Sequence, residues 1–436
     1  MLLSDMENQK SILHKCSKVF MTLMHNPLSI FHRLEYYLLS PFYQDYILPI
    51  KVRRVRNKRS ISVLFVLNEL GAWKTETLYK KMLGHPRFIT KLLLVPTIES
   101  PDAIDVLKAY LNNKGYKYDV VSDDEKEIKE CYSSDIIFYQ KPYEGQMEDK
   151  YFYLYHLDSL FCYVLYGFRN RNYPQIKKYK FIKFIWQFYA ENEKVIEESV
   201  PVFSTKAKNM VNTGLPFMDD LLQDKSFYDN PWKECGNKKK IIYAPHHTIF
   251  SDLYEYATFL DYCDFMLEMA EKYKDKVQWA FKPHPVLKSK LYSIWGKEKT
   301  DSYYKKWESL DNGQVSYGEY MGLFKHSDAM IHDCGSFRLE YLYTGNPVMF
   351  LQKGEVLNDY MNWQTEEALN LHYKGYNMDD IEGFIKDVIN GNDKLKDKRK
   401  DFVDTYLTPP NGKSACDNII NAILGKEEFA IKCNIH

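Results

Sequence analysis

The chain has 436 residues, of which 45% are hydrophobic and 27% are charged, as in ordinary folded globular proteins. Lysine plus arginine equals aspartate plus glutamate at 59 each, so the net charge gives no sign of a nucleic-acid-binding protein. The eight cysteines are scattered without a Cys-x-x-Cys pair, which argues against a disulfide framework and a standard zinc site. The sequence shows no secretory signal and no apolar run of about 18 residues. We therefore expect a cytoplasmic protein with two or three domains.

Residues 1–59 are predicted to form a helical and basic N-terminal extension. Apolar and aromatic residues recur at helical spacing over residues 28–39, and a basic run follows between Lys51 and Arg59. An amphipathic aromatic helix beside a basic cluster is typical of peripheral attachment to an anionic membrane, here the inner face of the cell membrane through residues 28–59. A helical extension packed on the first domain, with the basic residues in a solvated loop, explains the pattern equally well.

Residues 60–223 are predicted to form a first domain in which strands alternate with helices. Such alternation indicates a parallel, doubly wound sheet. The expected strands are 61–67, 88–95, 118–121, 135–139, 161–166 and 200–204, and the expected helices are 72–83, 101–112 and 177–192.

The polar stretch 224–240 contains Pro231, Gly236 and a run of lysines, and it is the predicted domain boundary. A second alternation follows within residues 224–436, which ends in a helical tail. Its expected strands are 241–244, 277–281, 314–317, 327–331 and 347–351, and its expected helices are 253–273, 286–295 and 321–325. The sequence thus predicts an α/β fold of two doubly wound Rossmann-type domains that face a cleft.

Three polar turns follow predicted strands of the second domain. Because the carboxyl ends of parallel strands meet at one edge of a sheet, these turns should converge. Together they provide imidazoles, cationic groups and carboxylates, which suit an anionic ligand. The turns contain Pro245, His246, His247 and Thr248; Lys282, Pro283, His284 and Pro285; and the stretch from His332 to Glu340.

The third turn combines Gly335 and Ser336 with the start of a predicted helix. Free backbone N–H groups and the helix dipole favour a phosphate there. An ordinary turn with Ser336 as the N-cap is the simpler alternative. Lys282 and Arg338 can balance phosphate charge, and a histidine can carry a proton near neutral pH.

Each group also has a purely structural explanation. His246 and His247 could bond to backbone in a loop, and Asp333 could cap a turn. Their spacing matches no standard zinc motif, so no metal ligand is assigned, although a divalent metal stays open. The convergence of three imidazole-bearing turns nevertheless favours a site over packing alone.

Over roughly residues 200–425 the sequence resembles the CDP-glycerol glycerophosphotransferases, the teichoic-acid primase and polymerase family with a GT-B fold. The resemblance rests on short motifs in register with those of the family. They are Tyr243-Ala244-Pro245, Lys282-Pro283-His284-Pro285, the set Asp333, Ser336, Glu340 and Tyr341 with Pro347 after it, and Gly214-Leu215-Pro216.

Two departures from the family pattern concern the acceptor side and the third turn. The family usually shows Trp-His-Gly in its first domain, where the histidine is the proposed base, and no such motif occurs here. The corresponding stretch 138–145 has no histidine, so Glu144 and His246 are the candidate bases toward the acceptor. In the third turn, Cys334 and Gly335 stand where the family has tyrosine and serine.

The resemblance implies a GT-B-like transferase that moves a polyol phosphate from a CDP-activated donor. The acceptor would be a hydroxyl of a cell-surface polymer or its lipid-linked precursor, and CMP would leave. His284, His246, Glu144 and Arg338 are the expected catalytic residues. The expected nucleotide- and substrate-binding residues are Pro245, His247, Thr248, Lys282, Asp333, Gly335, Ser336 and Glu340.

Within this assignment, Ser336 and the amides near Gly335 would bind the pyrophosphate. Lys282, His284 and Arg338 would stabilise developing charge, and Glu340 would hold the ribose or a basic neighbour. Two alternatives stay open at this point. One is a nucleotide-sugar glycosyltransferase of capsule or surface-glycan synthesis, and the other is a catalytically silent GT-B-like protein that binds a partner enzyme or a membrane glycan.

Overall fold

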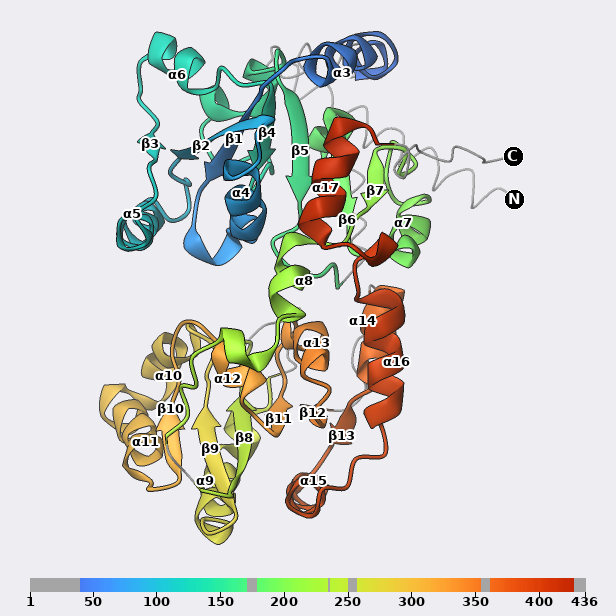
Figure 1. Cartoon of the computed structure of the whole chain (residues 1–436). Coiled ribbons are helices and arrows are strands. Elements are labelled where there is room, and N and C mark those ends of the chain that lie inside the picture. Colours follow the sequence, from blue (N-terminus) through green and yellow to red (C-terminus); the bar gives the residue numbers. More distant parts are fainter. Residues whose placement is uncertain (1–39, 171–178, 234–235, 250–256, 354–360, 427–436) are drawn as a thin grey trace, which may run out of the picture. The chain divides into compact units, whose positions relative to one another are not determined.

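The computed structural model describes residues 40–170, 179–233, 236–249, 257–353 and 361–426 (Figure 1). These residues build two parallel β-sheets with helices around them, which confirms the predicted α/β class of two doubly wound sheets. Within the described residues, one compact unit takes in 40–68, 86–162 and 179–187, and the other takes in 69–85, 163–170 and the residues from Phe188 onward. The predicted domain borders after residues 59 and 223 stay predictions.

The first sheet has seven strands in the order β3-β2-β1-β4-β5-β6-β7. β1 runs parallel to both β2 and β4, and six of its seven residues are buried. Such a continuous apolar strand is typical of a parallel sheet covered on both faces. The strands are β1 (Ile61–Leu67), β2 (Phe88–Leu94), β3 (Asp119–Val120), β4 (Ile136–Tyr139), β5 (Leu160–Val164), β6 (Ile185–Ala190) and β7 (Met210–Asn212).

Some helices of this half of the chain begin or end with recognisable caps. Asp124 accepts hydrogen bonds from the amides of Lys126 and Glu127 at the start of α6, and Gly115 in a left-handed conformation ends α5. The bounds are η1 (Tyr43–Ile47), α3 (Leu48–Arg56), η2 (Leu70–Ala72), α4 (Glu76–Leu83), α5 (Ala103–Lys114), α6 (Glu125–Cys131), η3 (Asp149–Tyr151), η4 (Tyr153–Tyr155), η6 (Lys180–Lys183), α7 (Glu193–Ser199), α8 (Pro216–Leu221) and η7 (Lys225–Phe227).

Two predicted elements of this half are wrong. The predicted helix 177–192 is the short helix η6 followed by the fully buried strand β6, apart from residues 177–178, which lie outside the described residues. β6 is rich in aromatic residues, and these favour a buried strand once both faces are covered. The predicted strand 200–204 is a turn after α7, in which the Phe203 amide donates to the Ser199 carbonyl.

The second sheet has six strands in the order β10-β9-β8-β11-β12-β13. Alternate residues of β8 face opposite layers, as the period of two requires. Ile241 and Tyr243 pack with the cluster of α9, α11 and α15, whereas Ile242 and Ala244 pack with that of α12, α13, α14 and α16. The strands are β8 (Lys239–Ala244), β9 (Val277–Phe281), β10 (Gly313–Val315), β11 (Ala329–His332), β12 (Val348–Leu351) and β13 (Tyr373–Gly375).

The helices around the second sheet therefore cover both faces. Their bounds are α9 (Phe259–Lys272), α10 (Leu287–Trp295), α11 (Lys297–Ser309), α12 (Met321–Lys325), α13 (Phe337–Glu340), η8 (Tyr341–Thr344), α14 (Trp363–Asn370), α15 (Met378–Asn390), α16 (Lys396–Tyr406), η9 (Pro410–Gly412) and α17 (Ala415–Leu424). None of the described helices has the length and apolar character needed to cross a membrane.

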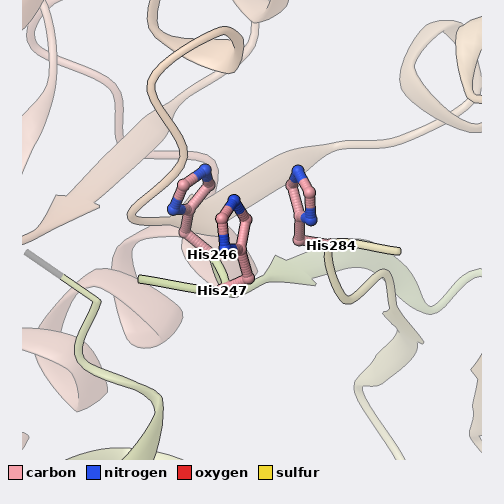
Figure 2. A group of neighbouring side chains, drawn as sticks. All are labelled: His246, His247 and His284. Atoms are coloured by element: carbon pink, nitrogen blue, oxygen red, sulfur yellow. The ribbon is translucent and has the colours of Figure 1, made fainter. Parts of the chain in front are cut away.

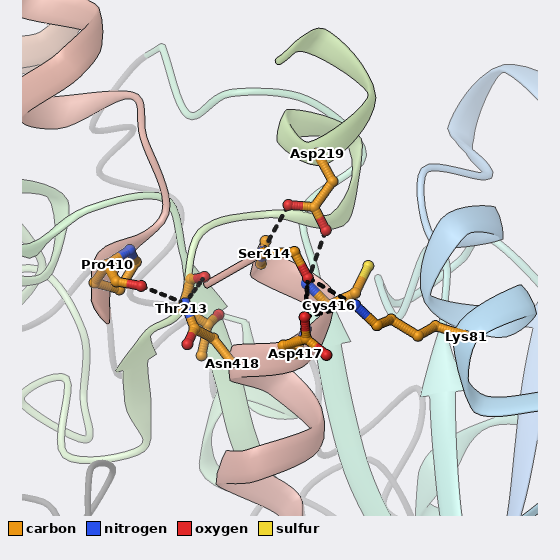
Figure 3. A network of polar contacts seen from close by, with 9 residues as sticks. Lys81, Thr213, Asp219, Pro410, Ser414, Cys416, Asp417 and Asn418 are labelled. Carbon is orange, nitrogen blue, oxygen red and sulfur yellow. Dashed lines mark hydrogen bonds and ion pairs between the residues drawn. The ribbon is translucent and has the colours of Figure 1, made fainter. Parts of the chain in front are cut away.

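A buried carboxylate anchors the start of α17 (Figure 3). Asp219 accepts hydrogen bonds from the amides of Ala415 at 2.6 Å and Cys416 at 2.9 Å, which satisfies orphan donors of the first turn. Gly214 lies beside this junction with a φ of 74°, and a Cβ there would lie 3.0 Å from Pro409. The Gly-Leu-Pro motif thus has a steric reason, because only glycine combines this φ with so close an approach.

The described part of the N-terminal extension is helical, and two of its lysines bind groups within the protein. The Lys51 ammonium donates to the Ser159 carbonyl at 2.9 Å, and Lys58 forms an ion pair with Asp135 at 2.6 Å. Arg53 and Arg54, in contrast, are exposed. The predicted amphipathic segment 28–39 lies outside the described residues.

Candidate functional site

The three predicted polar turns follow β8, β9 and β11, which are neighbours in the sheet order. The structure brings the first two together, so that His246, His247 and His284 form one cluster (Figure 2). The ring centroid of His247 lies 4.3 Å from that of His246 and 4.1 Å from that of His284. Convergence at the carboxyl edge of a parallel sheet therefore holds for these imidazoles.

Backbone contacts fix the two loops against each other. The His284 amide donates to the Pro245 carbonyl at 3.0 Å, which joins the turn after β9 to the turn after β8. The Val286 amide donates to Nδ1 of His284 at 3.2 Å, and the buried Thr248 hydroxyl bonds to Nδ1 of His246 at 3.1 Å. Because Nδ1 of His284 accepts this hydrogen bond, the neutral ring carries its own hydrogen on Nε2 and can donate it in a hydrogen bond.

The three imidazoles are held neutral at physiological pH. Burial lowers the pKa of His246 to about 3 and that of His284 to about 4, and it lowers the pKa of His247 as well. Nearby positive charges lower these pKa values further, and the charge of Lys290 does so for all three histidines. A cluster of neutral donors in a positive field is suited to an anionic ligand, whose charge would raise these pKa values.

The same cluster meets the geometric requirement for a metal, since one ligand atom of each histidine lies within 4.8 Å of the others. The chemistry of the donors fits a cation less well. Nδ1 of His284 already accepts an amide proton, so ligation by Nε2 would require the opposite tautomer and break that bond. Because the nearby charges are also positive, the residues present fit a phosphate better than a divalent ion.

Asp333 lies fully buried beneath the first turn and holds it in place. Its carboxylate accepts hydrogen bonds from the His246 amide at 2.5 Å and from the Thr258 amide at 2.6 Å. Burial raises the pKa of Asp333 to about 6, although these donors oppose the shift. Both carboxylate oxygens are therefore engaged by protein, and the residue supports the site through loop position.

Ser336 differs from a simple helix cap. Its side chain is exposed and forms no capping hydrogen bond to α13, and its backbone is already helical with a φ of −68°. Ser336 therefore occupies the N-cap position of α13, as the simpler alternative has it, but without the side-chain hydrogen bond of an ordinary cap. The half-buried Gly335 and the exposed hydroxyl of Ser336 are placed where a ligand can reach them.

A second cluster surrounds Tyr320, which sequence reasoning missed. The ammonium of the buried Lys282 donates to the Gly318 carbonyl at 3.1 Å and lies 5.7 Å from the Tyr320 ring centroid. The Tyr320 hydroxyl donates to Oε2 of Glu340 at 2.7 Å. Glu340 thus orients an aromatic ring beside Lys282, and burial raises the pKa of this glutamate.

Lys74 was also missed, and its ammonium lies 5.7 Å from the same Tyr320 ring. It belongs to the compact unit that contains the second sheet, although its sequence position is near the first strand. The available signal was weak, namely that Gly71-Ala72-Trp73-Lys74 follows β1, and ligands of open sheets bind beyond the carboxyl ends of strands.

Two other predicted catalytic residues, Arg338 and Glu144, lie outside these two clusters. The Arg338 guanidinium is buried and lies 4.5 Å from the ring centroid of Phe350. Within the histidine cluster, its charge lowers the pKa of His246. Glu144 belongs to the other compact unit, where it is exposed and its carboxylate lies 3.7 Å from the Lys180 ammonium.

Comparison with known proteins gives one family and a set of similar folds. Residues 177–425, more than half of the chain, match the model of the family described as CDP-Glycerol:Poly(glycerophosphate) glycerophosphotransferase. A search of curated protein sequences finds no match.

Solved structures with a similar fold share little sequence. A variant of the wall teichoic acid polymerase TagF soaked with CDPG is 13% identical with a TM-score of 0.55, and the alignment covers 90% of this chain and 98% of that one. A UDP-GlcNAc 2-epimerase from Neisseria meningitidis bound to UDP-GlcNAc is 14% identical with a TM-score of 0.54, over 84% of this chain and 100% of that one. At these identities the likeness establishes a shared GT-B-like architecture.

Proposed function

The chain belongs to the CDP-glycerol:poly(glycerophosphate) glycerophosphotransferase family, and on this premise we propose how its residues carry out the transfer. The protein moves glycerol phosphate from CDP-glycerol to a hydroxyl of a cell-surface polymer or a lipid-linked precursor. The observation that carries this proposal is the neutral imidazole cluster, which lies inside the matched region beside two cationic groups.

In the proposed reaction, the acceptor oxygen attacks the phosphorus next to glycerol. A new P–O bond forms, the bond to the bridging oxygen breaks, and CMP leaves with that oxygen. The acceptor proton passes to a base, for which Glu144 and His246 are the candidates. Such a transfer depends chiefly on positioning and on stabilisation of charge at the phosphoryl group.

His284 and Lys282 are the residues proposed to stabilise the leaving phosphate. Nε2–H of His284 is available as a donor, because Nδ1 accepts the Val286 amide proton. Lys282 contributes a buried ammonium whose pKa is lowered by desolvation, so that charge pairing with a phosphate is favoured there. The half-buried Gly335 and the exposed Ser336 are proposed to offer backbone N–H groups and a hydroxyl to the pyrophosphate, and His247 and Thr248 complete the first turn.

The nucleotide preference tests the donor assignment. We expect calorimetry to show tighter binding of CDP and CMP than of UDP or GDP. Ser336→Ala should weaken CDP binding about tenfold, because it removes a hydrogen bond to a charged group. Ser309→Ala is the matched control, since Ser309 is an exposed serine that precedes the amino end of β10.

Three results would contradict the assignment in different ways. Preference for UDP or GDP would favour a nucleotide-sugar glycosyltransferase. Equal effects of the two serine substitutions would remove the third turn from the site. No binding of any nucleotide would favour a catalytically silent protein.

We also propose that the N-terminal helices contact an anionic membrane surface. Phe42, Tyr46 and Ile50 are exposed at four-residue spacing, with 53%, 63% and 67% of their surface accessible. Arg53 and Arg54 follow on the same helical stretch and are exposed. Aromatic and apolar side chains beside arginines suit the interface of an anionic bilayer, where the lipid-linked acceptor would be located.

A further inference from the structure

Lys74 and Lys282 place two ammonium groups beside a single aromatic ring. Each Nζ lies 5.7 Å from the centroid of Tyr320, although the lysines are far apart in the chain. Lys282 is one of the residues assigned to the donor phosphates, and Lys74 is assigned to nothing in that proposal. The question is therefore whether Lys74 belongs to the same binding surface.

In the described part of the chain, neither ammonium group beside Tyr320 is paired directly with a carboxylate. Among the described residues, Lys74 forms no ion pair within 4 Å. Its charge lowers the pKa of the Glu340 carboxylate. Glu340 is buried and already accepts the Tyr320 hydroxyl proton at 2.7 Å. The exposed Glu319 also acts on Lys282 through its charge, but it forms no ion pair with either lysine. Both ammonium groups can therefore pair with a diphosphate.

The backbone around Lys74 is held firmly. Trp73 is buried, and the Lys74 amide donates to the Ala72 carbonyl at 2.9 Å in a tight turn. The following helix α4 is tied down by the Thr77 hydroxyl, which donates to the Asp220 carboxylate at 2.8 Å. All of these residues and Tyr320 belong to one compact unit, so the long Lys74 side chain starts from a fixed point.

We propose that Lys74 is a further donor-binding residue, which contacts the diphosphate of the nucleotide together with Lys282. This inference rests on the proposed function for the identity of the donor. Tyr320, oriented by Glu340, holds each ammonium group beside its ring before the ligand arrives. A second cation matters most for a ligand with two phosphates, because the added charge interacts with both.

Calorimetry on the full chain tests the proposal with CDP and CMP as probes. Lys74→Gln should weaken CDP binding about tenfold and CMP binding by less, whereas Lys74→Arg should retain most of the CDP affinity. Lys80→Gln is the matched control, because it removes the same charge from an exposed position on α4 that pairs with Glu76 at 2.9 Å. Thermal unfolding of each variant verifies that the fold is kept.

The proposal is overturned if Lys74→Gln binds CDP as tightly as the wild type, or if it loses CMP and CDP affinity by the same factor. A wild type that prefers UDP contradicts the proposed function but not the phosphate contact, and Lys74→Gln is then compared on UDP and UMP. A wild-type protein that binds neither cytidine nor uridine nucleotides overturns both the proposed function and the phosphate contact of Lys74.

Discussion

At the scale of single residues, the site is governed by imidazoles that stay neutral. Their neutrality has two physical causes, which are burial in the loops after β8 and β9 and the positive charges of Lys282, Lys290 and Arg338. A neutral imidazole can donate a hydrogen bond to a phosphate and become a stronger base when that anion arrives. The same property makes the histidines a source of pH-dependent stability.

We expect His284 to make the folded protein less stable in acid. Its pKa is about 4 in the folded chain and 6.5 without perturbation, so the unfolded chain binds more protons between these values. The contribution of His284 to the free energy of unfolding is fully present above pH 6.5 and falls as the pH drops toward 4. At pH 5, with solvent screening allowed for, the loss is about 1 kcal/mol.

Thermal unfolding measured at pH 7 and pH 5 tests this expectation. His246, His332 and His372 contribute in the same direction, and Asp333, whose pKa is raised to about 6, contributes in the opposite one. The comparison is therefore between wild type and His284→Asn, whose change between the two pH values should be smaller. An identical change in both proteins would contradict the assigned pKa shift.

At the scale of elements, the strands of both sheets were largely predictable, and the segment after residue 177 was not. β1, β8 and β9 are short runs of apolar residues bounded by turns, which identify buried parallel strands. In residues 177–192, lysines and aromatic residues alternate at a spacing that imitates an amphipathic helix. Tertiary packing decides the outcome there, since every residue of β6 is buried.

The exposed residues Phe42, Tyr46, Ile50, Arg53 and Arg54 give a prediction at this scale. Arg53→Gln combined with Arg54→Gln should reduce sedimentation with vesicles of anionic phospholipid several-fold, since each basic residue near such a surface contributes about 1 kcal/mol. Binding to vesicles of neutral phospholipid should be weak for both proteins. Lys80→Gln with Lys91→Gln serves as a control of equal charge. Unchanged sedimentation of the Arg53 and Arg54 variant would exclude this helix as the membrane contact.

At the scale of the whole molecule, the site was predictable where it depends on topology and unpredictable where it depends on tertiary contacts. The convergence of His246 and His284 follows from neighbouring parallel strands, which the alternation of elements already indicates. Tyr320 and Lys74 belong to segments with no shared motif, and their proximity depends on the packed structure. The engagement of Asp333 with the Thr258 amide likewise has no signature in the sequence.

The transfer itself tests the central claim most directly. Purified protein is incubated with CDP-glycerol and lipid-linked surface-polymer precursors, and mass spectrometry follows CMP release together with the gain of glycerol phosphate on the acceptor. We predict that both products form in equal amounts and that His284→Asn lowers the rate about a hundredfold or more. Release of UDP or GDP from nucleotide sugars without any turnover of CDP-glycerol would contradict the account.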